Sequence, residues 1–213
     1  MTLLDPDDLP LVQRLALSYA PRHMRKSVLA LLTLDHRLAT ILRQGGEPVI
    51  AQIKLAWWRD RLGENPDAWP PGEPLLQALR GWPESPSSLV ALVDGWEALL
   101  AEDLTMAGIE EFAAGRARAW QALAPAGSGE QAQQAASEWA LADLALHLGE
   151  AEAGAARRLA LAVKPLDIRL PRALRPLAVL RGLARRALER GSGELLDGPA
   201  AGLVALRIGL FGR

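Results

Sequence analysis

The sequence VLALLTLDHRLATILRQGGEPVIAQIKLAWWRDRL, residues 28–62, indicates the architecture of this protein. In its first half, apolar residues recur at three- and four-residue steps as far as Leu42, which is the pattern of a helix with one buried face. The pair Gly45-Gly46 ends this helix, and Pro48 falls in the first turn of the next one. The second helix is apolar almost all round, so we expect it to be buried.

The rest of the chain follows the same plan. No segment shows the period-two alternation between turn signals that marks strands. Proline and glycine separate further expected helices at residues 11–20, 75–82, 85–103, 105–123, 131–148, 151–163 and 171–190. Residues 191–202 read as a loop before a short apolar tail, 203–211. We therefore predict one all-α domain over residues 1–213, with about nine or ten helices around a central cavity or core.

Several classes of protein are excluded by composition. With no cysteine among its 213 residues, the chain cannot form a disulfide or a thiolate metal site. His23, His36 and His147 lack the spacing of a metal site, and no phosphate-binding glycine loop or nucleophile elbow is present. The N-terminus lacks the order of a signal peptide, and no apolar run is long enough to span a membrane. We expect a cytoplasmic protein, with a peripheral location on the inner membrane as the alternative.

The net charge of −1 hides an asymmetry between two parts of the chain. Residues 60–111 hold eleven acids and two bases, whereas residues 155–190 hold ten bases and two acids. Such a basic block can bind an anionic membrane surface or an acidic protein partner, although it also fits an ordinary solvated helix face. No nucleic-acid partner is expected. The candidate residues for anionic-surface binding are Arg172, Arg175, Arg181, Arg185 and Arg186.

A series of short motifs resembles the squalene/phytoene synthase family. The resemblance is collinear over about residues 11–190, and the tryptophan segment is its most specific part. The motifs are, in chain order, Tyr19-Ala20-Pro21, Arg25, Ala30-Leu31-Leu32-Thr33-Leu34, Glu47-Pro48, Leu55-Ala56-Trp57-Trp58-Arg59, Leu92-Val93-Asp94-Gly95-Trp96-Glu97 and Arg169-Leu170-Pro171.

The resemblance implies an all-α isoprenoid-synthase fold. Enzymes of this family condense two prenyl diphosphates head to head, and two aspartate-rich motifs on facing helices hold the magnesium ions that neutralise the leaving group. Magnesium needs such clusters of oxygen ligands. The resemblance also implies that the residues lining the substrate cavity are Tyr19, Trp57, Trp58, Phe112 and Arg118.

Both metal motifs are missing from this sequence. In the register of the first, the aspartates are replaced by Ala39, Thr40 and Arg43, and Asp35 is the only acid on that helix. In the second, Asp167 is again alone, since the expected positions are occupied by Ala160, Leu161, Ala162 and Lys164. Arg118 stands where a family glycine is expected, so we expect its side chain in the prenyl cavity. These changes resemble the divergent branch of the family that includes a mitochondrial complex I assembly factor.

Three hypotheses follow from the resemblance. The first is a non-catalytic protein without metal or cofactor that binds a membrane surface or a partner protein, as an assembly factor does. The second is a prenyltransferase with an atypical site, in which Mg²⁺ would be needed and Asp35, Arg37 and Arg59 are weak catalytic candidates. The third is a lipid- or quinone-binding module that keeps the apolar cavity without chemistry, so that a prenyl or other lipid is a further ligand class.

Overall fold

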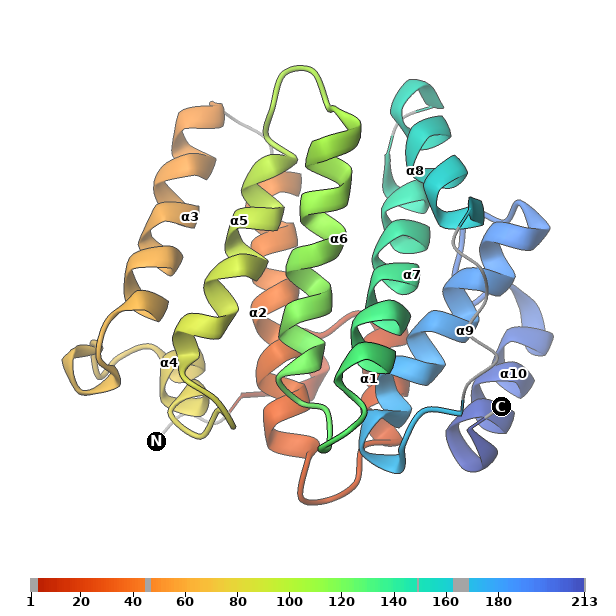
Figure 1. Ribbon diagram of the computed structural model, residues 1–213, viewed down its shortest axis with the longest axis horizontal. Helices are drawn as coiled ribbons and strands as arrows, with labels where there is room; N and C mark the ends of the chain where they lie inside the picture. Colours follow the sequence, from red (N-terminus) through yellow and green to blue (C-terminus); the bar gives the residue numbers. More distant parts are fainter. Residues whose placement is uncertain (1–3, 45–46, 149, 163–168, 213) are drawn as a thin grey trace.

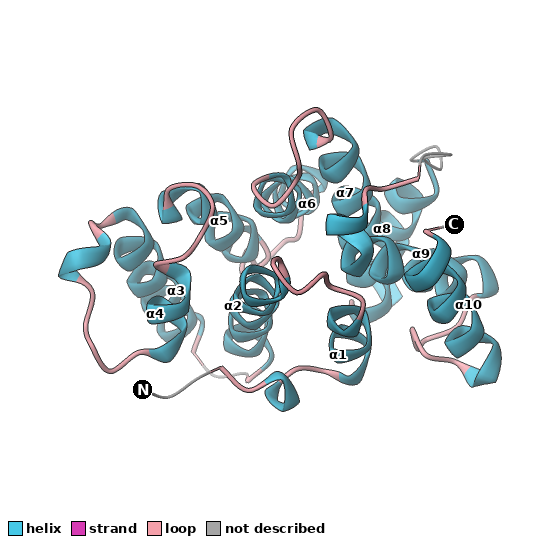
Figure 2. Ribbon diagram, turned by 90° about the horizontal axis from the view of Figure 1, so that it is seen from below, coloured by secondary structure: helices cyan, strands magenta, loops and turns pink. Residues whose placement is uncertain are grey.

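The computed structural model describes residues 4–44, 47–148, 150–162 and 169–212. Within these residues it contains ten α-helices and no strand, which confirms the predicted all-α class (Figure 1, Figure 2). The helices are α1 (Leu11–Ser18), α2 (Arg25–Arg43), α3 (Pro48–Gly63), α4 (Pro74–Leu79), α5 (Val90–Ala98), α6 (Met106–Gln121), α7 (Gly129–His147), α8 (Glu150–Ala162), α9 (Arg175–Arg190) and α10 (Gly198–Phe211).

Proline sets several of the helix starts. The short 3₁₀ turns Pro6–Asp8, Pro66–Ala68 and Pro86–Leu89 each begin with proline, whose fixed φ suits a first turn. A fourth turn, Arg172–Leu174, leads into α9, where Pro176 lies in the first turn. The helix expected over residues 85–103 is therefore shorter than predicted, because its first turn is 3₁₀ and α5 ends at Ala98.

The helices pack in an order that largely follows the chain. Helix α5 packs on α6, α6 on α7, and α7 on both α8 and α9. Helix α2 lies behind α5 and α6 in Figure 1, and α1 packs against α9. Trp120, Trp139 and Phe112 are among the largest fully buried side chains, so the core lies around α6 and α7.

Two glycines bring α5 and α6 close together. A Cβ at Gly115 of α6 would lie 2.3 Å from the Ala91 carbonyl oxygen, and one at Gly95 of α5 would lie 3.0 Å from the Phe112 Cα. Neither position has room for a side chain, because both neighbours are backbone atoms. This contact places Trp96 beside Phe112, with ring centroids 4.8 Å apart.

Helix α3 lies at one end of the molecule, and its burial differs from the prediction (Figure 1). It buries only Leu55, Trp58 and Leu62, while Val49, Ile50, Ile53 and Trp57 are exposed. The expectation of a helix buried all round is wrong, because α3 packs chiefly against α5 and leaves its opposite face open. Gly45 and Gly46, which precede α3 in the sequence, lie outside the described residues.

The C-terminal segment forms a helix rather than a loop and short tail. Helix α10 begins at Gly198 and lies at the end of the molecule opposite α3 (Figure 1). It buries Ala201, Ala205 and Ile208 against its neighbours and exposes Leu203, Leu206, Leu210 and Phe211. Leu203, Leu206 and Leu210 recur every three to four residues and Phe211 follows directly, so α10 has one packed face and one open apolar face.

Candidate functional site

A cavity of about 580 Å³ lies where α2, α5, α6 and α7 meet. Asp35, Ala39 and Arg43 reach it from α2, the helix in the register of the missing first metal motif. Much of the remaining wall is apolar, from Leu42, Leu99, Phe112, Leu144, Leu146 and Leu148.

The charged centre of this cavity is Arg116 on α6. Its guanidinium binds Asp35 of α2 through two nitrogens, with Nε 3.0 Å from Oδ1 and Nη2 2.9 Å from Oδ2. Its third nitrogen, Nη1, donates to Oδ2 of Asp143 on α7 at 2.7 Å. Trp96 of α5 completes the network, because its indole Nε1 donates to Asp35 Oδ1 at 2.8 Å. One arginine therefore joins two carboxylates from facing helices.

Three aromatic rings surround the same guanidinium. Its central carbon lies 4.3 Å from the ring centroid of Trp139, 4.7 Å from that of Phe112 and 5.1 Å from that of Trp96. Such contacts stabilise a cation that has lost its water. Only 4% of the Arg116 and Asp35 side chains is exposed, against 16% for Asp143. The network is a largely buried ion-pair cluster.

The electrostatics of the cavity follow from this arrangement. Burial alone would lower the pKa of Arg116, but the nearby charges of Asp35 and Asp143 raise it overall, so the guanidinium stays charged. Burial lowers the pKa of His36, and the positive charge of Arg43 lowers it further. His36 therefore stays neutral near pH 7, and the Asp35–Arg116–Asp143 network carries one net negative charge.

The residues around the cavity do not fit a magnesium cluster. Both acids of the network are engaged by Arg116, whose positive charge would repel a divalent ion placed between them. No group of three or more histidine, aspartate or glutamate side chains that could hold a metal occurs in the described part of the chain. Asp167, the lone acid in the register of the second motif, lies outside the described residues.

Arg118 does not occupy the cavity. It is exposed and lines a separate depression with Glu130 and Gln133, whereas Arg116, two residues earlier, points inward. Two residues on a helix differ by roughly 200° in direction, so they face opposite sides. The signal that could have identified Arg116 is its position one turn after Phe112, on the apolar face of α6.

The other residues expected to line the cavity are divided. Phe112 lines it, as expected. Tyr19 instead packs over Gly209 of α10, where a Cβ would lie 2.2 Å from its ring. Trp57 and Trp58 line a different depression between α2 and α3, and Trp58 is 6% exposed against 39% for Trp57.

The weak catalytic candidates are also separated. Asp35 lies in the cavity, but Arg37 pairs with Glu73 at 2.6 Å beside α4. Arg59 binds Asp94 at 2.7 Å and also pairs with Glu97, which ties α3 to α5. These two arginines are therefore occupied in contacts between helices, and the structure does not bring them to Asp35.

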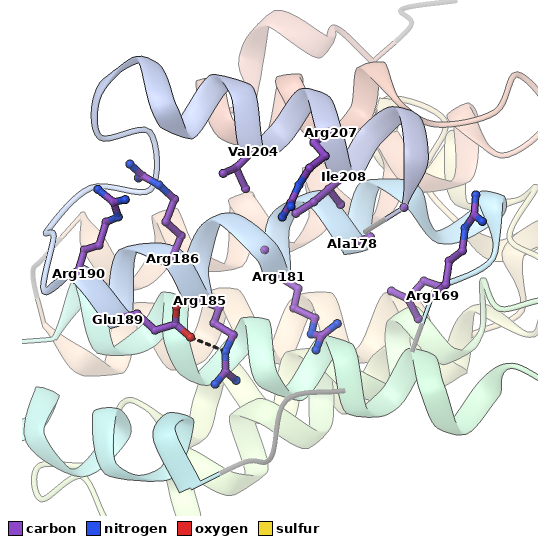
Figure 3. Close-up of a pocket in the computed structure, with 13 residues that line it drawn as sticks. Arg169, Ala178, Arg181, Arg185, Arg186, Glu189, Arg190, Val204, Arg207 and Ile208 are labelled. Carbon is purple, nitrogen blue, oxygen red and sulfur yellow. Dashed lines mark hydrogen bonds and ion pairs between the residues drawn. The ribbon is translucent and has the colours of Figure 1, made fainter. Parts of the chain in front are cut away.

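The basic block contributes to a second candidate site, a groove of about 620 Å³ beside α9 and α10 (Figure 3). Arg181, Arg185 and Arg186 line this groove. Arg172 is exposed outside it. Arg175 is buried instead and donates to the Ile208 carbonyl oxygen at 3.2 Å, so its proposed surface role is wrong. Burial, aided by Arg169 and Arg172, lowers the pKa of Arg175.

Comparison with known proteins gives one match. The family model for squalene/phytoene synthase matches residues 14–152, which is well over half of the chain. No curated protein and no solved structure matches significantly. The match covers α2 through α7 and most of the lining of the central cavity, although the lining residues at 10–13 and 193–196 fall outside it. Helices α9 and α10 and the groove lie beyond the match. Among the described helices, none is both long enough and apolar enough to cross a membrane.

Proposed function

The chain belongs to the squalene/phytoene synthase family, and we propose that it is a non-catalytic member of that family that binds an anionic membrane surface. The observation that carries this proposal is the open apolar face of α10, which lies beside a groove rich in arginine. Helices that lie at a membrane interface combine an apolar face with nearby basic residues.

The apolar contribution comes from α10. Leu203, Leu206, Leu210 and Phe211 are between 47% and 67% exposed, and their spacing places them along one side of the helix. Burying a fully exposed side chain of this size stabilises binding by about 1.5–3 kcal/mol, so each of these half-exposed side chains contributes roughly half of that. Four of them are enough for measurable binding even after the entropy lost on association is counted.

The electrostatic contribution comes from the groove. Arg186, Arg190 and Arg207 line it, and the phosphates of an anionic leaflet attract such juxtaposed charges by about 1 kcal/mol each. This attraction falls with added salt, whereas the apolar contribution does not. Binding through α9 and α10 is therefore expected to be stronger on anionic vesicles and to weaken partly at high salt.

The Arg116 network supports the absence of family chemistry. A cation already lies between the two carboxylates that face the cavity, and a prenyl diphosphate would meet a network with one net negative charge. Incubation of the full chain with Mg²⁺ and farnesyl or geranylgeranyl diphosphate is expected to release no diphosphate. A prenyl hydrocarbon product would overturn the non-catalytic half of the proposal and favour the prenyltransferase hypothesis.

Co-sedimentation with vesicles tests the membrane half. The full chain is expected to bind phosphatidylcholine vesicles that contain phosphatidylglycerol and to bind pure phosphatidylcholine weakly. Replacing Leu206 and Leu210 with serine should weaken binding at least about tenfold. The matched control is Leu11→Ser, since Leu11 is 61% exposed but lies on α1. Equal binding by all three proteins, or none by the unmodified chain, would refute membrane binding through α10.

A second candidate function is the binding of an uncharged lipid or quinone in the central cavity. The observation that favours it is the volume of about 580 Å³, within the usual range for ligand pockets, together with its largely apolar wall. A short-chain quinone should quench part of the tryptophan fluorescence saturably, because Trp96 lines the cavity, and Ala39→Phe should abolish this saturable quenching by filling the space. Unchanged saturation in Ala39→Phe would count against this function.

A further inference from the structure

The groove beside α9 and α10 has an unusual balance of charge. Six arginines line it, namely Arg169, Arg181, Arg185, Arg186, Arg190 and Arg207, and Glu189 is the one acid among its lining residues. An arginine cluster of this kind is costly unless counter-charges lie nearby, because the side chains repel one another. These arginines differ in whether they already have a partner within the protein.

Two of the six are engaged within the protein. Arg181 binds Glu138 on α7, and both of these side chains are largely buried. Arg185 donates from Nε to Glu189 Oε1 at 2.8 Å, one turn along the same helix. Figure 3 shows both of these arginines extending from α9 away from α10. Arg181 therefore ties α9 to α7, and Arg185 is engaged locally along α9 through its Nε.

Three others lie on the side of α9 that faces α10. Arg186 and Arg190 are one turn apart on α9 and extend toward the same end of the groove, while Arg207 extends from α10 toward α9 (Figure 3). None of these three has a hydrogen-bond or ion-pair partner among the described residues. Nη1 of Arg186 is fully buried and has no partner there either. A buried donor of this kind is normally satisfied by a ligand or water.

Close packing of α10 holds the groove in shape. A Cβ at Gly182 of α9 would lie 2.2 Å from the Ile208 side chain, and one at Gly209 would lie 2.2 Å from the Tyr19 ring. Arg175 binds the Ile208 carbonyl oxygen at the C-terminal end of the same helix. Arg207 is therefore carried by a helix that is fixed on α9 and α1, so its position relative to Arg186 and Arg190 is set by the fold.

We propose that Arg186, Arg190 and Arg207 bind the phosphate group of a phosphomonoester lipid while the apolar face of α10 enters the membrane. This inference rests on the membrane function proposed above and specifies the headgroup. Leu206 and Leu210 lie on either side of Arg207 in the sequence of α10. The helix therefore places leucines that can contact acyl chains close to an arginine that can bind the phosphate. A soluble phosphate compound would gain nothing from these exposed leucines.

The number of free arginines favours a monoester over a diester. Guanidinium groups bind phosphate oxygens in pairs of parallel hydrogen bonds, and each arginine offers five N–H donors. A phosphomonoester carries about −1.5 to −2 charges and three terminal oxygens, whereas a diester headgroup such as phosphatidylglycerol carries one charge. Three arginines match the first better than the second.

The test compares two vesicles of equal surface charge. One contains phosphatidic acid and the other contains more phosphatidylglycerol, adjusted until their electrophoretic mobilities agree. The full chain is expected to bind the phosphatidic acid vesicles at least about tenfold more tightly, because charge-assisted hydrogen bonds add to the general attraction. Equal affinity for the two vesicles would overturn the headgroup proposal and leave the membrane function intact. Binding to neither would refute both.

Matched variants show whether the groove is responsible. Arg190→Gln with Arg207→Gln is expected to remove the preference for phosphatidic acid while keeping the residual binding through α10. Arg172→Gln is the control, because Arg172 is exposed on the preceding turn and does not line the groove. Circular dichroism checks that each variant is folded. A preference that persists in the double variant, or that disappears in the control, would refute the assignment.

Inorganic phosphate distinguishes the lipid from a free ligand. If the ligand is a lipid, millimolar inorganic phosphate should displace the chain from phosphatidic acid vesicles only weakly. Inorganic phosphate has no acyl chains, so it gains nothing from the insertion of α10 into the membrane. Phosphate that binds to the isolated full chain with high affinity, and displaces it from phosphatidic acid vesicles, would show instead that the groove is a site for a soluble phosphate compound.

Discussion

Arg116 in the central cavity and Arg207 in the groove of α9 and α10 are the same residue type in opposite circumstances. Arg116 is buried, is bound by two carboxylates and is surrounded by three aromatic rings. Arg207 is exposed, has no partner among the described residues and lies between exposed leucines. The charge of Arg116 is neutralised by carboxylates within the protein, whereas the charge of Arg207 is available to bind an anionic group outside it.

The two regions therefore separate the family's architecture from the proposed membrane function. Most of the cavity lining lies within residues 14–152, which match the family, and there an arginine lies between two acids on facing helices. The groove lies beyond the match, and its arginines outnumber its acids six to one. Variants that change one region without the other can test whether this separation is real.

The largest expected effect is that of Arg116→Met. The substitution leaves Asp35 and Asp143 buried without a counter-charge, so we expect it to lower the free energy of unfolding by about 3–5 kcal/mol. Urea denaturation measures this loss. Arg118→Met, on the exposed side of the same helix, should change it by less than about 0.5 kcal/mol. Adding Asp35→Asn to Arg116→Met should recover part of the loss; no recovery would mean that packing, and not charge, explains it.

Gly209→Ala should have an intermediate effect that is confined to the other region. The new Cβ would lie 2.2 Å from the rigid ring of Tyr19, so α10 must shift, at an expected cost of about 1–3 kcal/mol. Weaker vesicle binding should accompany this cost. Gly202→Ala in the same helix meets nothing within 4 Å and should be neutral or stabilising by up to about 1 kcal/mol. Similar effects from both substitutions would contradict close packing of α10 on α1.

Arg186→Met gives the opposite result from Arg116→Met if the comparison holds. The substitution removes one positive charge from a cluster of like charges. It also removes a buried Nη1 that has no partner among the described residues. The free energy of unfolding should therefore stay constant or rise by up to about 1 kcal/mol. Thermal unfolding without vesicles measures this. A loss of more than about 1 kcal/mol would show that Arg186 is structural, as Arg116 is.

The smallest expected effect concerns the pH dependence contributed by His36. Burial and Arg43 lower the pKa of His36 below its usual value of 6.5, so the unfolded chain binds more protons than the native one as the pH falls through this range. The free energy of unfolding should therefore decrease below about pH 6.5, and His36→Gln should reduce that decrease. Urea midpoints at about pH 7.5 and about pH 5.5 provide the measurement, and identical slopes in both proteins would exclude this contribution.

Much of the fold can be predicted from the sequence because helix signals are local. Three such signals are the end of the apolar pattern at Leu42, the proline at position 48 and the spacing of the apolar residues. Each depends on only a few neighbouring residues, and the observed bounds of α2 and α3 agree closely with them. The tryptophan segment indicates the family for the same reason, because its residues are contiguous in the chain. The burial of α3 cannot be predicted in this way, because exposure depends on what other helices cover it.

The candidate sites are less predictable because they depend on pairs of residues far apart in the chain. Asp35 is visible in the sequence as the lone acid on its helix, but its partner Arg116 is 81 residues away. Asp143 gives no signal within a helix that reads as ordinary. For the basic block, composition shows the charge, yet it cannot show that Arg175 is buried, that Arg181 is paired, or that Arg207 joins the groove from α10.

The network around Arg116 also bears on the order in which the chain assembles. Its contacts join residues 35, 96, 116 and 143, and so require α2, α5, α6 and α7 to be in their final places together. A collapsed state with only some of these helices in place would hold an unpaired charge in an apolar interior, which is strongly unfavourable. We therefore expect these four helices to exchange their amide hydrogens as a single cooperative unit, while α3 and α10 open independently at lower cost.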